Sequence, residues 1–360
     1  MDGGMEKNST SLPLILLTLL TGIALGWLLN DLMRQPPAPL AVAPTQAPTA
    51  TARATSVPTA PVPSSTIAPQ SPVPSPPPAA TPLPATAIPP IPTASPQPQV
   101  IGYVGHRAAA GETLEQIAAR YRTSPALIKA YNMINAPLRT GRELVVPLIE
   151  PGAAGEALLV QRGNPMRPWI ALTLDAGAGA APTPRILDAL RVRGITITFF
   201  LTGRWIRDNP DLVRRMVADG HELANHTMNH PDLTTLDDEA IRRELNETEA
   251  ILHDIAPDAV IRPFFRPPYG AYNERVLRVA LSEGYLPVYW SLDSLDSVGE
   301  PKTPEFLIAR VTQKLSPDDL RGAIILAHCG SDATADALPD ILDRFAAMGF
   351  EVRKLSDVMQ

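Results

Sequence analysis

The chain has 360 residues and a net charge of −6, with acidic and basic residues interspersed rather than gathered in blocks. It has no basic patch of the kind that binds phosphate backbones, which excludes nucleic acid as an expected partner. A single cysteine, Cys329, excludes an intramolecular disulfide and a cysteine-based zinc site. The composition changes strongly along the chain, which predicts several distinct segments.

Residues 1–34 form the first segment, and they contain a long apolar run. Residues 12–29 carry no charge and include Trp27 near one end. This length is just enough for a helix that spans a bilayer, and tryptophan suits the membrane interface. We expect residues 12–30 to be an uncleaved membrane anchor with everything after it outside the cytoplasm. The alternative is a signal peptide cleaved before secretion, but the nearest Ala-x-Ala site, Ala41-Val42-Ala43, lies well beyond the run.

Residues 35–100 form a linker rich in proline, alanine and threonine. This segment holds 21 of the 41 prolines, and Arg53 is its only ionisable residue. Such a composition cannot bury enough apolar surface to offset the entropy lost on ordering. We expect an extended spacer that holds the following domains away from the membrane.

Residues 101–150 form a small module with the predicted order strand, helix, helix, strand. Thr113 is placed to cap the first helix, Ser124 and Pro125 to begin the second, and residues 144–147 to form the closing strand. The module resembles a LysM domain in GETLEQIAARYRTS at 111–124, IKAYN at 128–132 and TGRELVVP at 140–147. The resemblance implies binding to glycans that contain N-acetylglucosamine, such as peptidoglycan or chitin. A generic two-helix module is the alternative.

Residues 151–360 alternate between apolar runs typical of strands and amphipathic runs typical of helices. This alternation predicts an α/β domain with a parallel sheet covered by helices, and its size favours an incomplete β/α barrel. The expected strands are residues 169–174, 195–201, 221–225, 286–292 and 323–327. The expected helices are residues 184–192, 210–218, 238–254, 273–283, 304–314 and 335–348.

Polar side chains follow several of these strands, where function is expected in such folds. Asp175 ends the first strand, and His226 and His230 follow the third. Two histidines four residues apart face the same way if the segment makes one helical turn, which suits two imidazoles on zinc. Pro231 is expected to end that turn.

Three further segments complete the set of polar residues. Arg266-Pro267-Pro268-Tyr269-Gly270 is expected to be a rigid turn with a pre-set backbone N–H and a nearby guanidinium. Residues 290–296 end a strand with two acids, Asp293 and Asp296, and His328 ends the last clear strand. Together these groups predict metal-assisted hydrolysis.

The region from residue 168 to 360 resembles the polysaccharide deacetylase family, also known as the NodB-homology domain or carbohydrate esterase family 4. Five motif regions appear in order and carry the resemblance. They are TLDAG at 173–177, HTMNH at 226–230, RPPYG at 266–270, WSLDSLDS at 290–297 and ILAH at 325–328.

The resemblance implies a role in acid–base chemistry for four residues. Asp175 is the general base that activates water, and Arg266 orients it. His328 is the general acid for the departing amine, and Asp296 orients His328 and adjusts its pKa.

The resemblance also implies how substrate and cofactor bind. His226 and His230 hold a divalent metal, with zinc expected first and cobalt, manganese or nickel as alternatives. The backbone N–H of Tyr269 helps to stabilise the oxyanion, and Trp290 and Leu326 line the acetyl pocket.

Two positions depart from the family pattern. Ser297 replaces a tryptophan, which we interpret as a change in packing. Ala176 replaces an aspartate that ligates the metal, which leaves two protein ligands where a catalytic zinc usually has three. Asp175 could move onto the metal, water could complete its shell, or binding could be weak or absent.

The sequence therefore predicts a metal-dependent hydrolase that acts on non-peptide carbon–nitrogen bonds and deacetylates cell-wall polysaccharide. Peptidoglycan and chitin-like oligosaccharides are both expected glycan partners, and N-acetylglucosamine, N-acetylmuramic acid and ester substrates all stay open. The alternative is a catalytically impaired protein that binds wall glycan without turnover, for which Ala176 is the support.

Overall fold

The computed structural model describes residues 99–360. The predicted membrane anchor and nearly all of the predicted linker lie outside these residues. Among the residues that are described, no helix is both long and apolar enough to cross a bilayer.

The module at residues 102–148 has the predicted order strand, helix, helix, strand. It consists of β1 (Gly102–Arg107), α2 (Leu114–Tyr121), α3 (Pro125–Tyr131) and β2 (Glu143–Leu148), with β1 and β2 antiparallel. Thr113 caps α2 through a capping box with Gln116, as its sequence predicts. Ser124 precedes α3 as predicted, but its side chain makes no capping hydrogen bond.

The second domain is built on an eight-stranded sheet. Seven of its strands run parallel in the order β7-β6-β5-β4-β3-β9-β8. The eighth strand, β10, pairs with β3. The path of seven strands ends at β7 and β8, which do not pair with each other, so the curled sheet is an open, incomplete barrel. The predicted fold class of this domain is confirmed. The strands are β3 (Trp169–Ala176), β4 (Thr198–Leu201), β5 (Glu222–Asn225), β6 (Phe264–Phe265), β7 (Leu286–Pro287), β8 (Leu292–Asp293), β9 (Ile324–His328) and β10 (Glu351–Val352).

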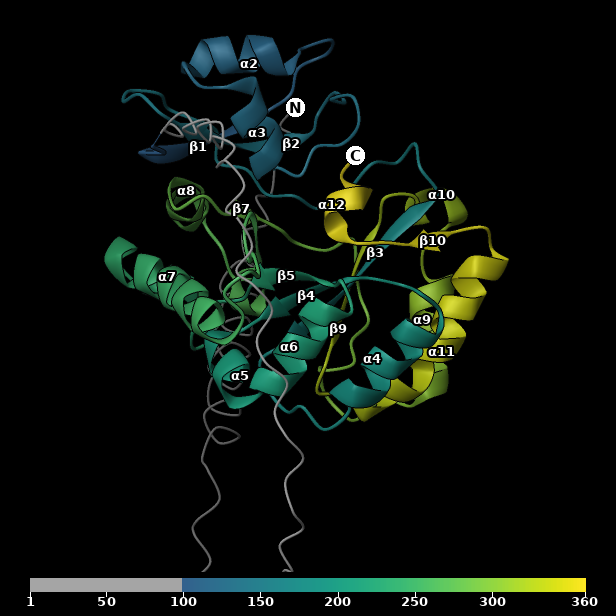
Figure 1. The fold of residues 1–360 in the computed structure, drawn as a ribbon. Coiled ribbons are helices and arrows are strands. Elements are labelled where there is room, and N and C mark those ends of the chain that lie inside the picture. The colour runs from purple at the N-terminus through teal and green to yellow at the C-terminus, as the bar shows by residue number, and fades with distance from the viewer. Residues whose placement is uncertain (1–98) are drawn as a thin grey trace, which may run out of the picture. The chain divides into compact units, whose positions relative to one another are not determined.

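Helices cover the outside of this sheet (Figure 1). Their apolar faces pack with the strands into one large core, and burial of such faces is the main source of stability. The helices are α4 (Thr183–Val192), α5 (Gly203–Asp208), α6 (Pro210–Ala218), α7 (Asp238–Ile255), α8 (Glu274–Ser282), α9 (Pro304–Gln313), α10 (Pro317–Leu320), α11 (Asp332–Ala347) and α12 (Leu355–Val358).

The structure differs from the sequence prediction at residues 286–292. The single strand expected there is two short strands, because β7 pairs with β6 and β8 pairs with β9 at the opposite edge. The residues between them cross the open side of the barrel, where Val288 bridges to Val160. The two-residue strands β6 and β10 were not predicted, because an apolar pattern this short has no readable period.

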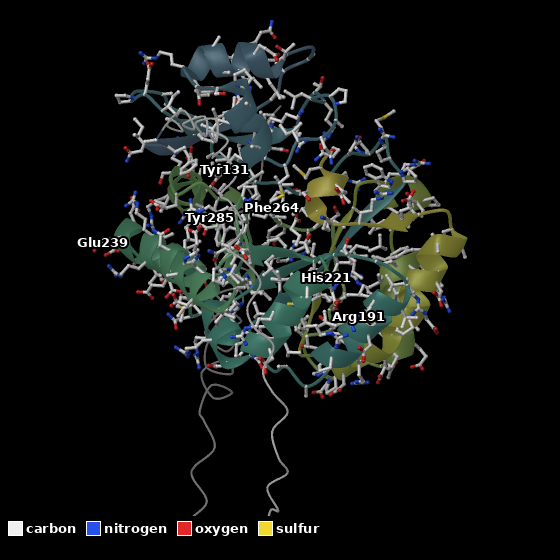
Figure 2. The ribbon with its side chains drawn as sticks, viewed as in Figure 1. Tyr131, Arg191, His221, Glu239, Phe264 and Tyr285 are labelled. Carbon is white, nitrogen blue, oxygen red and sulfur yellow. The ribbon has the colours of Figure 1, made fainter. Side chains whose placement is uncertain are left out.

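The small module packs against the end of the barrel at which the strands begin. The Tyr131 hydroxyl donates to the Gly284 carbonyl at 2.6 Å, and Arg142 Nη1 donates to Gln360 Oε1 at 2.9 Å. Gln360 follows α12, whose Leu355 N–H donates to Thr198 Oγ1 at the start of β4. Figure 2 shows Tyr131 near this boundary. The ends of the strands that carry the polar motifs lie on the opposite side of the barrel.

Candidate active site

A cavity of about 630 Å³ lies at the carboxyl ends of the parallel strands. Eight of the nine predicted site residues line it. They are Asp175, His226, His230, Tyr269, Trp290, Asp296, Leu326 and His328. The ninth, Arg266, is completely buried and contacts Asp175. The structure therefore brings the whole predicted set together, as the shared edge of a parallel sheet requires.

Asp175 is held in place by a buried ion pair. Arg266 Nη1 donates to Asp175 Oδ1 at 2.6 Å, and the guanidinium carbon lies 4.0 Å from the centroid of the Phe200 ring. Burial lowers the pKa of Arg266, and the charge of Asp175 opposes that shift. The pair fixes the carboxylate at the end of β3, with its second oxygen 3.5 Å from His226 Nε2.

The two histidines of the second motif present their rings to the cavity. His226 Nδ1 lies 2.9 Å from the Arg266 carbonyl oxygen, which makes Nδ1 the donor and leaves the lone pair of Nε2 toward Asp175. Burial lowers the pKa of His226 to about 4 and also lowers the pKa of His230. The ring centroids are 4.8 Å apart at an interplanar angle of 74°.

The predicted helical turn at residues 226–230 is wrong. Thr227 and His230 have positive φ angles of 68° and 61°, so the segment is an irregular loop. Asn225 Oδ1 accepts from the Thr227 N–H at 2.8 Å, and Thr227 Oγ1 accepts from the His230 N–H at 3.0 Å. These side-chain hydrogen bonds replace those of a helix and bring both rings to the same wall of the cavity.

Two prolines, Pro267 and Pro268, restrict the backbone of the loop at residues 266–270. Tyr269 has a φ of 59° within the short 3-10 helix Pro268–Gly270, and its ring lies 4.5 Å from that of His230. As the second residue of that helix, it has a backbone N–H with no partner inside the helix. A Cβ on Gly270 would come within 2.7 Å of Trp290, so the close approach requires glycine.

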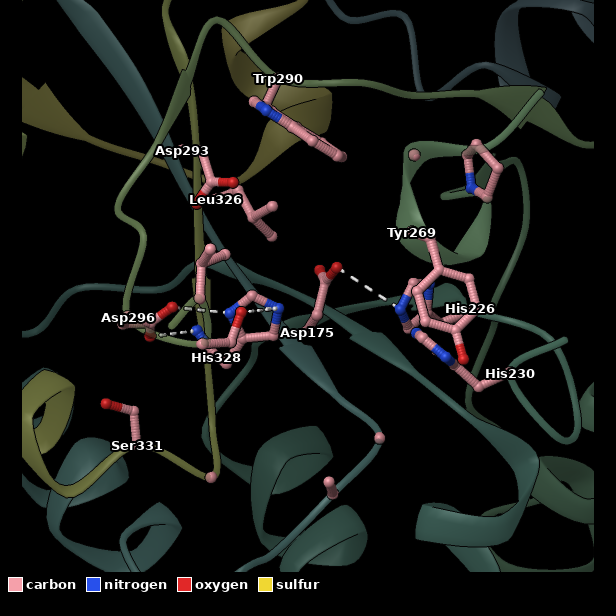
Figure 3. A pocket seen from close by; sticks show the side chains of 17 residues that line it. Asp175, His226, His230, Tyr269, Trp290, Asp293, Asp296, Leu326, His328 and Ser331 are labelled. Atoms are coloured by element: carbon pink, nitrogen blue, oxygen red, sulfur yellow. Dashed lines mark hydrogen bonds and ion pairs between the residues drawn. The ribbon is translucent and has the colours of Figure 1, made fainter. Parts of the chain in front are cut away.

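His328 is fixed on the other side of the cavity by Asp296 (Figure 3). Asp296 Oδ1 lies 2.7 Å from His328 Nδ1, while Oδ2 accepts from the His328 N–H at 2.8 Å and from Thr334 Oγ1 at 2.5 Å. Burial opposes the charge of Asp296, but the hydrogen bonds outweigh it and lower the pKa of this carboxyl. Burial likewise opposes the charge of His328, but the hydrogen bond to Asp296 and the nearby carboxylates outweigh it and raise the pKa of His328.

Comparison with known proteins shows which family has this arrangement. The family model for polysaccharide deacetylase matches residues 162–288, and that for the LysM domain matches residues 106–147. A chitooligosaccharide deacetylase of Rhizobium leguminosarum bv. trifolii is 38% identical over 200 residues, which cover 52% of this chain and 89% of that protein. The chain belongs to the polysaccharide deacetylase family.

Further members of this family resemble the chain in sequence and structure. The peptidoglycan-N-acetylmuramic acid deacetylase PdaA of Bacillus subtilis is 33% identical over 198 residues, covering 55% of this chain and 73% of that protein. The solved structure of PdaA, described as a family 4 carbohydrate esterase, matches with a TM-score of 0.53 at 32% identity, covering 56% of this chain and 85% of that one. The predicted family and its class of hydrolase, which acts on carbon–nitrogen bonds, are thus confirmed.

One further solved structure that matches the chain is described as a pseudoenzyme. A family 4 pseudoenzyme from Bacillus anthracis is 25% identical, with a TM-score of 0.52, and the match covers 66% of this chain and 82% of that one. The family therefore includes a protein that is described as a pseudoenzyme.

Of the metal ligands that the family resemblance implies, His226 and His230 are present and the aspartate is replaced by Ala176. Ala176 is fully buried in the apolar core and contributes no donor. Within residues 99–360, no group of three His, Cys, Asp or Glu side chains could hold a metal ion. His226 and His230 supply the imidazole donors that zinc takes, but two protein ligands are fewer than the usual three.

Three polar residues in the cavity were given no catalytic or binding role by the sequence prediction. Asp293, Ser297 and Ser331 all line it. Ser297 is exposed and its hydroxyl lies 3.5 Å from His328 Nε2, so the replacement of tryptophan changes the cavity wall and places a hydroxyl there. Ser297 could be noticed in the sequence because it follows Asp296. Its contact with His328 could not be predicted, because that contact depends on the pairing of β8 with β9.

Proposed function

We propose that this chain removes acetyl groups from N-acetylated sugars of cell-wall polysaccharide and releases acetate. One observation carries the proposal: Asp175, held by Arg266, and His328, held by Asp296, face each other across one cavity. A base fixed on one side of a carbonyl and an acid fixed on the other are the two groups that amide hydrolysis needs. The relatives named as chitooligosaccharide and peptidoglycan deacetylases support this substrate class.

The chemistry follows from the positions of these groups. Asp175 accepts a proton from the water that attacks the acetamide carbon, and the Tyr269 N–H donates to the oxygen that becomes negative. His328, whose pKa the hydrogen bond to Asp296 raises, gives its proton to the departing amine. Trp290 and Leu326 contribute apolar surface to the cavity for the acetyl methyl group.

A divalent cation is the cofactor that the family resemblance implies. We infer that zinc, or cobalt, manganese or nickel, binds at His226 and His230 more weakly than in relatives that keep the aspartate, because Ala176 offers no ligand. Such a cation would supply polarisation of the acyl carbonyl.

We also propose where the protein acts. The LysM-like module would hold it on peptidoglycan or a chitin-like glycan. Residues 12–30 would anchor it in the membrane with both domains on the outer side, and secretion after signal cleavage is the alternative. Fractionation of cells followed by protease treatment of intact cells tests this, because only an extracytoplasmic domain is digested.

Release of acetate from N-acetylglucosamine oligomers and from peptidoglycan tests the main proposal. Asp175→Asn should abolish release because an amide does not accept the proton from water. The control is Asp343→Asn, which changes an exposed carboxylate paired with Arg193 on the outer surface. Equal acetate release by wild type and Asp175→Asn would refute the assignment of the base.

A second candidate function is glycan binding without turnover, and the incomplete metal site is the observation that favours it. It predicts retention on insoluble peptidoglycan with no acetate released in any of the four metals. Ala176→Asp discriminates between the two functions. Activity that appears only in this variant would show that the natural chain is a binding protein.

A further inference from the structure

A serine, a histidine and an aspartate form a continuous chain of contacts on one wall of the cavity. Ser297 Oγ lies 3.5 Å from His328 Nε2, and His328 Nδ1 lies 2.7 Å from Asp296 Oδ1. The two ring nitrogens of one imidazole therefore face a hydroxyl on one side and a carboxylate on the other. This is the order of contacts that activates a serine nucleophile.

The exposure of the three side chains increases from Asp296 through His328 to Ser297. The Asp296 side chain has no exposed surface, the His328 side chain is 29% exposed, and Ser297 is exposed to the cavity. Asp296 is also held by the His328 N–H and by Thr334 Oγ1, so its position is fixed from the helix α11 side as well as from β9. A rigid acid, an oriented base and an accessible hydroxyl are what such a nucleophile requires.

We propose that Ser297 is a nucleophile and that this chain hydrolyses short acyl esters, such as O-acetylated sugars, through an acyl-serine intermediate without a bound cation. The activity goes beyond the amide deacetylation proposed above, although it uses the same cavity. Esters are the fitting class because an alkoxide leaves more readily than an unprotonated amide nitrogen, so ester cleavage depends less on protonation of the leaving group. Leu326 and Trp290, which line the cavity, suit a short apolar acyl group.

The reaction balances with one water per ester. Ser297 Oγ bonds to the acyl carbon while His328 Nε2 takes the hydroxyl proton. The tetrahedral intermediate then breaks its bond to the alkoxide, which takes that proton from Nε2 and leaves as the alcohol. Water next attacks the acyl-serine and gives a proton to Nε2, the bond from Oγ to the acyl carbon breaks, and Oγ recovers the proton as the acid leaves.

The two departures from the family pattern act together in this view. Ala176 removes a metal ligand, and Ser297 brings a hydroxyl to the imidazole that the family uses as a general acid. In ester hydrolysis His328 would first act as a base, whereas in amide deacetylation it would act as an acid. Ester hydrolysis should therefore rise with pH through the pKa of His328, whereas amide deacetylation should fall.

The test uses p-nitrophenyl acetate and the full chain after dialysis against a chelator. Wild type should show a burst of nitrophenol, and acid quenching should trap a protein heavier by one acetyl group, with the modification mapped to residue 297. Ser297→Ala should lose the burst and the adduct and slow turnover at least about tenfold. The matched control is Ser282→Ala, because Ser282 is an exposed serine at the end of α8, outside the cavity, and its hydroxyl donates to the Val279 carbonyl.

Further variants keep this proposal separate from amide deacetylation. Asp175→Asn should retain the burst and the adduct while it loses acetate release from N-acetylated glycan. Ser297→Cys should restore an adduct as a thioester, which hydroxylamine removes. Ser297 is on the surface, so thermal unfolding should show little change in Ser297→Ala. An unmodified residue 297 in wild type, or equal ester turnover in a folded Ser297→Ala, would overturn the proposal.

Discussion

Replacement of Arg266 by methionine should damage both stability and the candidate base. The guanidinium is completely buried and pairs with the Asp175 carboxylate, which is 5% exposed, at 2.6 Å. Methionine keeps much of the stem but leaves Asp175 as an uncompensated buried charge. Removing one partner of such a pair costs about 3–5 kcal/mol, which lowers Tm by roughly 6–20 °C in a domain of this size.

The double variant shows whether the uncompensated charge of Asp175 causes the loss of stability in Arg266→Met. Asn at position 175 needs no cation, so Arg266→Met combined with Asp175→Asn should cost less than the sum of the two single changes by about 2 kcal/mol. Denaturant unfolding of the four proteins measures this coupling. The control is Arg185→Met, because the ion pairs of Arg185 with Asp332 and Asp336 are exposed and should contribute about 0–1 kcal/mol.

The same variants report on the reaction. Loss of the guanidinium also removes the hydrogen bond that holds the Asp175 carboxylate in place, so acetate release should be slower in Arg266→Met. Strictly additive stability changes together with unchanged acetate release in Arg266→Met would refute the reasoning that Arg266 acts by pairing with Asp175.

Three further predictions concern the histidines and the metal. Asp296→Asn removes the carboxylate that raises the pKa of His328, so the basic limb of amide deacetylation should move to lower pH, and an unchanged limb would contradict the pairing. His221, whose pKa burial lowers to about 4, takes up no proton in the folded state between pH 6.5 and 4 while the unfolded chain does. The free energy of unfolding should therefore fall as the pH drops through that window, by up to about 3 kcal/mol, and His221→Gln should reduce the fall, as urea unfolding at several pH values would measure. A slope as steep in His221→Gln as in wild type would mean that other groups, His226 first, account for it. Ala176→Asp should tighten zinc binding at least about tenfold by adding a third ligand, and calorimetry that gives equal affinities would show that position 176 does not reach the metal.

Local patterns in the sequence predicted most of the longer elements, and the motifs at the strand ends predicted residues that line the cavity. Thr113 and Gln116 stand three residues apart, which specifies a capping box at the start of α2 without reference to the rest of the fold. The apolar run before Asp175 and the one before His328 predict strands, and parallel strands place their carboxyl ends at one edge. For this reason the site residues could be predicted before their geometry was known.

The tertiary structure decided how those residues meet. Arg266 and Asp175 are 91 positions apart, and their contact depends on the order of β6 and β3 in the curled sheet. The positive φ angles at Thr227 and His230 follow from side-chain hydrogen bonds that no period reveals. The contact of Ser297 with His328 requires that β8 pair with β9 across the open edge. Periodicity specifies which way a side chain faces along its own strand, whereas distances between strands are determined by packing of the whole domain.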